Sequence, residues 1–172
     1  TISDLSYDEL CKLTGKAGLI PPRLSEVLAL CKDKIKLDIE LKEGGYEDRV
    51  ISMVTSSFDY GSFMMKSFLD QVVLRVKTLD ANIKAGLLVG IKDLPFPGRF
   101  HEYFPMKRLK KCKADFISPH YRFATAPFLF RMSLKKKDVY IWTVNNSEQI
   151  QKFLKKNVTG IMPIFLLVFS FL

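Results

Sequence analysis

The segment from Lys36 to Lys42 alternates charged and apolar residues in a way that could hold a phosphate group. Alternate residues of a strand share one face, so the charged side chains would point together: Lys36, Asp38, Glu40 and Lys42. Near the end of such a strand, the Glu40 carboxylate could ligate a hard cation and the Lys42 ammonium could bind a phosphate oxygen. An edge strand with a solvated charged face would show the same pattern, so this segment alone leaves both interpretations open.

Other reactive side chains are few and scattered. The only histidines are His101 and His120, and we expect ordinary structural or surface roles for both. Cys11, Cys31 and Cys112 lie far apart and form no Cys-x-x-Cys pair, which argues against a zinc site or a disulfide framework. Reduced thiols in the cytoplasm are the simplest interpretation.

The composition indicates one folded, basic domain. The chain has 172 residues, of which 48% are hydrophobic, and this argues against a disordered protein. Its 27 Lys and Arg against 18 Asp and Glu give a net charge of +9. Such a charge suits a phosphate, a nucleic acid or a membrane surface, although a solvated lysine-rich surface is the simpler interpretation.

Three basic clusters lie on or just after expected helices, at 107–113, 135–137 and 152–156. A solvated helix face is again the simpler interpretation, and docking on anionic lipid headgroups is the functional alternative. Aromatic residues are not interleaved with these lysines, so we expect no nucleic-acid partner.

Apolar periodicity predicts alternating strands and helices after two N-terminal helices. The first helix would be capped by Asp4 or Ser6, and Pro21-Pro22 would open the second. Strands are expected at 35–41, 62–68, 85–91, 114–119, 139–144 and 158–162. Helices are expected at 48–57, 70–79, 106–113, 124–135 and from Asn146 to about 156, with a loop over 93–105. This alternation predicts βα units and a parallel sheet.

Polar residues fall at or near the ends of the expected strands, as they do around the active site of a (β/α)₈ barrel. They are Glu40 and Lys42, Ser67, Pro119 with His120, and Asn145. Because a full barrel usually has about 250 residues, we expect an α/β TIM barrel that lacks its first strands.

Several segments, taken in order, resemble the glycerophosphodiester phosphodiesterase family. Asp38–Lys42 is similar to its Glu-x-Lys strand, and Ile20–Leu28 to the IPTLEEVL helix upstream. The remaining similarities are Lys66–Phe68 with the SF strand, Ala114–His120 with the AD.I.P strand, Val139–Asn145 with the V.VWTVN strand, and Thr159–Met162 with the start of GI.TD.P. The Trp-Thr-Val-Asn strand is the most specific of these motifs.

The resemblance implies an incomplete TIM barrel of the phospholipase C-like phosphodiesterase type. It implies hydrolysis of glycerophosphodiesters to sn-glycerol 3-phosphate and an alcohol, in glycerophospholipid metabolism, with a divalent cation, Ca²⁺ or Mg²⁺. Carried over to this sequence, Glu40 is a metal ligand and Lys42 is the catalytic residue that contacts the phosphate. Phe68 and Trp142 wall the substrate-binding pocket.

Two departures from the family limit this assignment. Its HRG, E.D and HD motifs, which carry the catalytic histidines and most metal ligands, would precede Thr1. We therefore expect residues 1–162 to form a partial domain that is inactive alone and binds no cation tightly. Residues 163–172 form a divergent apolar tail, too short to span a membrane, that could reflect truncation, a frameshift or a sticky strand. A non-catalytic barrel module that binds phospholipid headgroups or a membrane surface remains the alternative, and membrane association of a cytoplasmic protein stays open.

Overall fold

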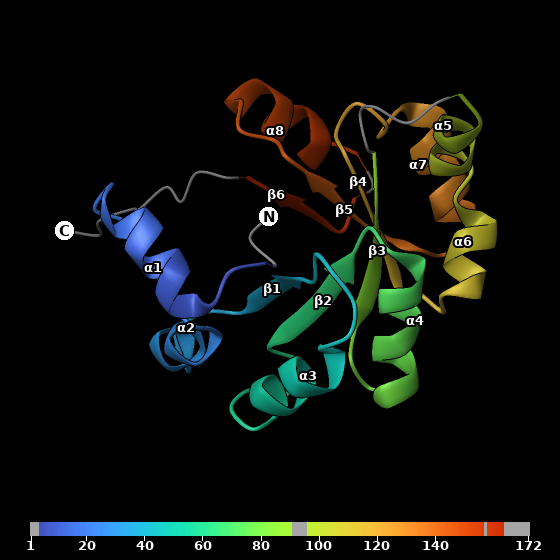
Figure 1. Ribbon diagram of the computed structural model, residues 1–172. Helices are drawn as coiled ribbons and strands as arrows, with labels where there is room; N and C mark the ends of the chain where they lie inside the picture. Colours follow the sequence, from blue (N-terminus) through green and yellow to red (C-terminus); the bar gives the residue numbers. More distant parts are fainter. Residues whose placement is uncertain (1–3, 91–95, 157, 164–172) are drawn as a thin grey trace.

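The computed structural model describes residues 4–90, 96–156 and 158–163. Within these residues, six strands form one parallel sheet in which spatial order follows chain order (Figure 1). The strands are β1 (Leu37–Glu40), β2 (Phe63–Ser67), β3 (Ala85–Val89), β4 (Phe116–Pro119), β5 (Asp138–Trp142) and β6 (Gly160–Met162). The helices are α1 (Tyr7–Gly15), α2 (Leu24–Cys31), α3 (Glu47–Thr55), α4 (Asp70–Leu79), α5 (Phe96–Tyr103), α6 (Met106–Lys111), α7 (Ala126–Leu134) and α8 (Ser147–Leu154).

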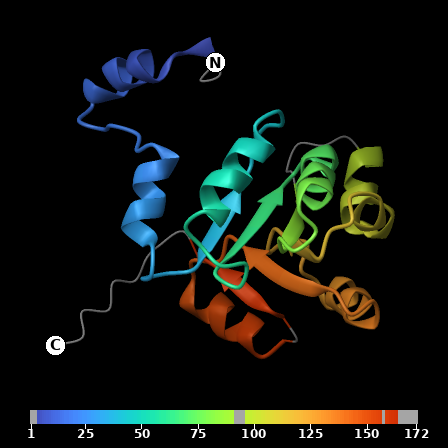
Figure 2. The same cartoon turned by 90° about the horizontal axis from the view of Figure 1, so that it is seen from below.

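The helices that follow the strands lie around the outside of the curved sheet (Figure 2). Each buries one apolar stripe: Val54 of α3, Val72 and Val76 of α4, Leu109 of α6 and Phe128 of α7 all belong to the same core. In parallel strands, residues on the outer face meet these helices, while the alternate residues point to the concave side. The alternation along each strand therefore places one set of residues in the core between sheet and helices. The other set, which includes Asp38 and Lys66, points to the concave side.

The sheet curls strongly, because side chains of distant strands meet on its concave side. Four steps of about 4.8 Å would put β2 and β6 roughly 19 Å apart in a flat sheet. The Lys66 Nζ of β2 nevertheless lies 2.9 Å from the Met162 Sδ of β6. Lys84, just before β3, likewise donates to Asp138 of β5 at 2.7 Å. The predicted open portion of a parallel barrel, with helices packed outside, is confirmed.

Gly86 on the concave side leaves space for the ring of Phe116. A Cβ on Gly86 would lie 2.1 Å from the Phe116 ring, so this ring occupies the space that a side chain would need. The Phe116 and Tyr140 rings meet edge to face at 5.0 Å. The Lys84 ammonium lies 5.2 Å from the Tyr140 ring centroid, where a cation is favoured.

Most predicted elements are confirmed, including two capped helices. Ser6 accepts from the Glu9 backbone at the start of α1, and the Asn146 side chain accepts from Gln149 at the start of α8. Pro21-Pro22 was expected inside α2, but that helix begins at Leu24, after the prolines.

The prediction of a loop over 93–105 is wrong, because Phe96–Tyr103 forms α5. Proline at the second helical position sacrifices no backbone bond. Tertiary contacts stabilise the helix: the buried Glu102 carboxylate accepts from the Gly90 amide and pairs with Arg108. The Tyr103 ring packs 6.0 Å from Phe128 of α7.

The apolar tail expected over 163–172 lies outside the described residues from position 164 onward. None of the helices in the described part of the chain combines the length and apolar character needed to span a bilayer. The three cysteines carry free thiols, as expected.

Candidate functional site

The carboxyl ends of the six parallel strands define one edge of the sheet, which we call the mouth. Glu40 ends β1, Ser67 ends β2, Pro119 ends β4 and Trp142 ends β5. Because these strands are parallel neighbours, the residues lie at the same edge, as the sequence predicted. Ser67 has a structural part there: its buried hydroxyl donates to the Leu41 carbonyl at 2.7 Å.

Trp142 is held firmly at the mouth. Its indole Nε1 donates to the Ser118 carbonyl at 2.8 Å. The Phe68 ring meets it edge to face, with centroids 5.5 Å apart. On another side, the His120 ring lies 5.0 Å away at 75°. The two residues expected to wall a pocket, Phe68 and Trp142, therefore do lie together.

His120 lies in the mouth, beside Trp142. The sequence predicted its place at a strand end with Pro119, but gave it an ordinary structural or surface role. Its backbone amide donates to the Val89 carbonyl at 2.9 Å, continuing the β3–β4 ladder. A Cβ on Gly90 would lie 2.5 Å from the His120 Cβ, so the glycine permits this close approach. The available signal was its place directly after a buried strand. His101, in contrast, lies exposed on α5.

Glu40 and Lys42 form an ion pair at the rim of the mouth, with Nζ and Oε1 2.6 Å apart. The Lys42 side chain is 71% exposed, so its ammonium can also reach a ligand phosphate. A solvated pair of this kind is worth little to stability, about 0–1 kcal/mol.

The donor set does not fit a divalent cation. Ca²⁺ takes 6–8 oxygen ligands, and Mg²⁺ requires an octahedron. Glu40 offers one carboxylate that is already paired with an ammonium. Among the described residues, no group of three or more His, Cys, Asp and Glu side chains could hold a metal ion.

Lys66 is a second cation near the mouth. The sequence analysis gave no role to its charge. Its side chain is only 8% exposed, and it pairs with Asp38 of β1. In the β1–β2 register Lys66 lies opposite Glu40, so both side chains share the concave face. The signal was a lysine inside an otherwise apolar strand, Phe63–Ser67, next to a strand with an alternating charged row.

An ionic network supports the loops of the mouth from behind. Arg108 of α6 pairs with Asp70 at 2.7 Å and donates to the Phe68 carbonyl at 3.1 Å. It also pairs with Glu102, which accepts from the Gly90 amide. Burial alone would lower the pKa of Arg108, but the Asp70 hydrogen bond and the Glu102 charge outweigh it and raise that pKa. The network thereby ties the backbone of Phe68 to the end of β3.

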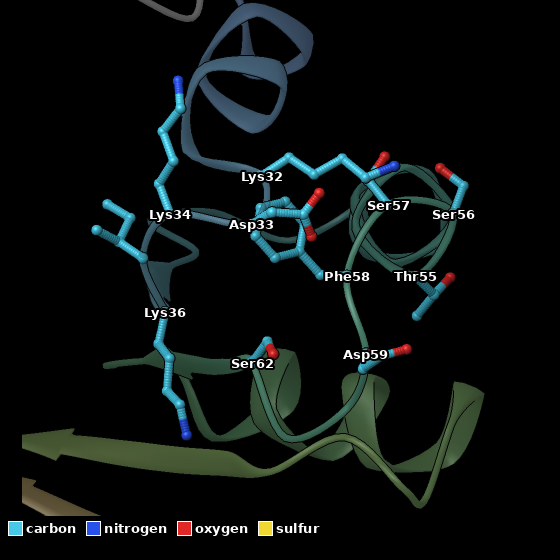
Figure 3. Close-up of a pocket in the computed structure, with 11 residues that line it drawn as sticks. Lys32, Asp33, Lys34, Lys36, Thr55, Ser56, Ser57, Phe58, Asp59 and Ser62 are labelled. Carbon is cyan, nitrogen blue, oxygen red and sulfur yellow. The ribbon is translucent and has the colours of Figure 1, made fainter.

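A polar depression of about 560 Å³ lies at the opposite edge of the sheet, in the loops before β1 and β2 (Figure 3). It is lined by Lys32, Asp33, Lys34, Ile35, Lys36, Thr55, Ser56, Ser57, Phe58, Asp59 and Ser62. Barrel enzymes carry their chemistry at the carboxyl edge, and charges of both signs line this depression. We therefore assign the candidate site to the mouth.

Comparison with solved structures identifies glycerophosphodiester phosphodiesterases as similar folds. The enzyme from Thermotoga maritima matches with a TM-score of 0.68 at 21% identity, over 93% of this chain and 66% of its own length. The enzyme from Parabacteroides distasonis matches with a TM-score of 0.64 at 19% identity, over 83% of this chain and 59% of its own. An Oleispira antarctica phosphodiesterase in complex with the product sn-glycerol-3-phosphate matches with a TM-score of 0.58 at 16% identity. This match covers 74% of this chain and 51% of its own length.

These likenesses confirm, at the level of the fold, the resemblance that the motifs indicated. The chain spans between about half and two thirds of the length of these structures. Comparison with protein-family models gives no match, and comparison with curated protein sequences gives none either.

Proposed function

We propose that this chain contributes the substrate-binding part of a glycerophosphodiester phosphodiesterase. The overall reaction joins a water oxygen to phosphorus, breaks the bond from phosphorus to the alcohol oxygen, and leaves the proton on the departing alcohol. The observation that carries the proposal is the joint placement of Trp142, Phe68 and the Glu40–Lys42 pair at the mouth of a barrel with this fold.

In this proposal each residue has a separate task. The Lys42 ammonium offsets the charge of the phosphodiester, which is the main form of catalysis in phosphoryl transfer. The perpendicular rings of Phe68 and Trp142 contact the carbons of the glycerol group and exclude water from one side. The product complex of the Oleispira antarctica phosphodiesterase supports a glycerol phosphate as the ligand class.

The complete enzyme would use Ca²⁺ or Mg²⁺, with Glu40 supplying one oxygen ligand. Because the described donor set does not fit such an ion, we propose that this chain alone binds it weakly and does not turn over. Loss of general acid–base groups alone typically costs 10²- to 10⁴-fold in rate. We also propose a cytoplasmic location, which the free thiols support.

A non-catalytic headgroup-binding module is the second candidate, and the donor set at Glu40 favours it. Glycerol 3-phosphate release from glycerophosphocholine, with added Ca²⁺ or Mg²⁺, separates the two candidates. We expect no release by this chain, and metal-dependent release by a longer chain that adds the HRG, E.D and HD motifs upstream. Glu40→Ala in that longer chain should abolish release, whereas Glu43→Ala, which removes a nearby but more exposed carboxylate, should not. A longer chain that stays inactive while still binding glycerophosphocholine would favour the module.

A further inference from the structure

An exposed apolar stripe runs along the outer face of α5 and α7. Phe130 and Leu134, one turn apart on α7, are each 65% exposed. Phe100 of α5 and Phe104, which directly follows that helix, are 54% and 43% exposed. Large apolar side chains that gather on an exterior face mark an interaction surface, because scattered single residues are the norm elsewhere.

Helix α7 contacts the end of α5 through Arg131. The Arg131 guanidinium of α7 lies 4.7 Å from the Phe104 ring centroid and 4.5 Å from that of Tyr103. It also donates to the Tyr103 carbonyl at 3.1 Å. The Phe100 and Phe104 rings are 4.6 Å apart. Arg131 thus joins α7 to the end of α5, and Figure 1 shows these two helices next to each other.

Basic side chains continue the surface onto α6 and the turn after α7. A groove of about 460 Å³ lies there, lined by Met106, Lys107, Leu109, Lys110, Lys135 and Lys137. The only acidic residue between Tyr103 and Lys137 is Asp115, and it is paired with Lys77 at 2.8 Å. Glu102 of α5 is buried and paired with Arg108, so the exposed charged side chains named for this surface are positive.

We propose that this surface docks the protein on an anionic lipid bilayer. We call it the docking face; it consists of Phe100, Phe104, Phe130 and Leu134 with Arg131, Lys107, Lys110, Lys135 and Lys136. The phenylalanines and the leucine enter the headgroup boundary, and the lysines contact lipid phosphates. The inference goes beyond the proposed function, since it concerns the outer helices and not the mouth.

Two features favour a bilayer over a nucleic acid or a protein. Leu134 offers a nucleic acid no stacking surface, yet it is as exposed as Phe130. Phe130 and Leu134 project from a helix that lies beside a basic groove. Exposed apolar side chains next to basic ones are typical of helices that bind the membrane interface.

Sedimentation with lipid vesicles tests the docking face. The full chain should bind vesicles of phosphatidylcholine with phosphatidylserine, and bind pure phosphatidylcholine much more weakly, with binding that falls as salt rises. The double variant Phe130→Gln, Leu134→Gln should reduce binding by about tenfold or more, from the lost apolar burial. Glutamine preserves helix propensity, so the fold is retained.

A charge variant, Lys135→Glu with Lys136→Glu, should abolish the preference for phosphatidylserine. Matched controls lie on α8, where Leu154 is 61% exposed and Lys152 and Lys155 are exposed. Leu154→Gln, and Lys152→Glu with Lys155→Glu, should bind like the unaltered chain. The proposal is overturned if the α7 variants bind like the unaltered chain, if the α8 variants lose as much binding, or if duplex or single-stranded DNA binds more tightly than the vesicles through the same residues.

Discussion

The ion pair between Asp38 and Lys66, on the concave side of the sheet, allows a direct test of the sheet's curvature. Asp38→Ala removes the carboxylate and leaves the Lys66 ammonium, only 8% exposed, without its partner. Breaking a buried pair in this way typically costs 3–5 kcal/mol. Because the Asp38 side chain is 29% exposed and water can reach it, we expect a loss of about 2–3 kcal/mol.

Equilibrium unfolding in urea, followed by circular dichroism, measures this loss. The double variant Asp38→Ala, Lys66→Met should recover most of the stability, because an apolar side chain of similar length replaces the uncompensated charge. Asp59→Ala, which removes an exposed carboxylate, serves as the control and should change stability by less than about 0.5 kcal/mol. Two results would show that Lys66 is not enclosed within a curled sheet. One is an equal loss of stability in Asp38→Ala and Asp59→Ala, and the other is a double variant no more stable than Asp38→Ala alone.

Three further outcomes follow from the packing and the titrating groups. Cys112 should resist thiol reagents in the native protein, because burial raises the pKa of its thiol. Gly86→Ala should lower stability by about 1–3 kcal/mol in urea unfolding, because the new methyl group would meet the Phe116 ring. The Tyr60 hydroxyl bond lowers the pKa of Asp80, so Tyr60→Phe should raise that pKa in a carboxyl NMR titration. A lowered carboxyl pKa stabilises the fold above the unfolded pKa, and this contribution is lost as pH falls through the folded pKa. The variant should therefore be less stable near neutral pH and equal to the unaltered chain in acid.

Each of these outcomes has a control within the chain. The half-buried thiols Cys11 and Cys31 should react before Cys112, and equal rates for all three would refute the buried environment. Gly61 has nothing within 4 Å of a new Cβ, so Gly61→Ala should be close to neutral, and equal losses at Gly61 and Gly86 would contradict the filled barrel. An unchanged Asp80 titration in Tyr60→Phe would show that the hydroxyl bond does not form.

The order of strands and helices could be predicted because each βα unit carries its own local signal. The buried strand at Ala85–Val89 is apolar throughout, and the helix at Asp70–Leu79 places its valines at helical spacing. Asn146 begins α8 with a side-chain cap three residues before Gln149, a pattern that is visible without any structure.

What escaped prediction depends on contacts between distant residues. Helix α5 contains aromatics and a proline, and its anchor is the Glu102 side chain bound to Gly90 and Arg108. The inward position of Lys66 becomes informative only when Asp38 lies beside it. The ring contact between His120 and Trp142 exists only because β5 lies beside β4. No periodicity within one segment encodes such pairings.

The most direct test of the central claim uses Trp142, the only tryptophan in the chain. Its indole lies between Phe68 and His120 at the mouth, so a ligand there must change its fluorescence. Titration with glycerophosphocholine or sn-glycerol 3-phosphate should give a saturable change. Lys42→Ala should weaken binding by about tenfold, the loss expected for one charge-assisted contact. Lys34→Ala, at the opposite edge of the sheet, should leave binding unchanged. A flat titration, or equal effects of Lys42→Ala and Lys34→Ala, would contradict a glycerol phosphate site at the mouth.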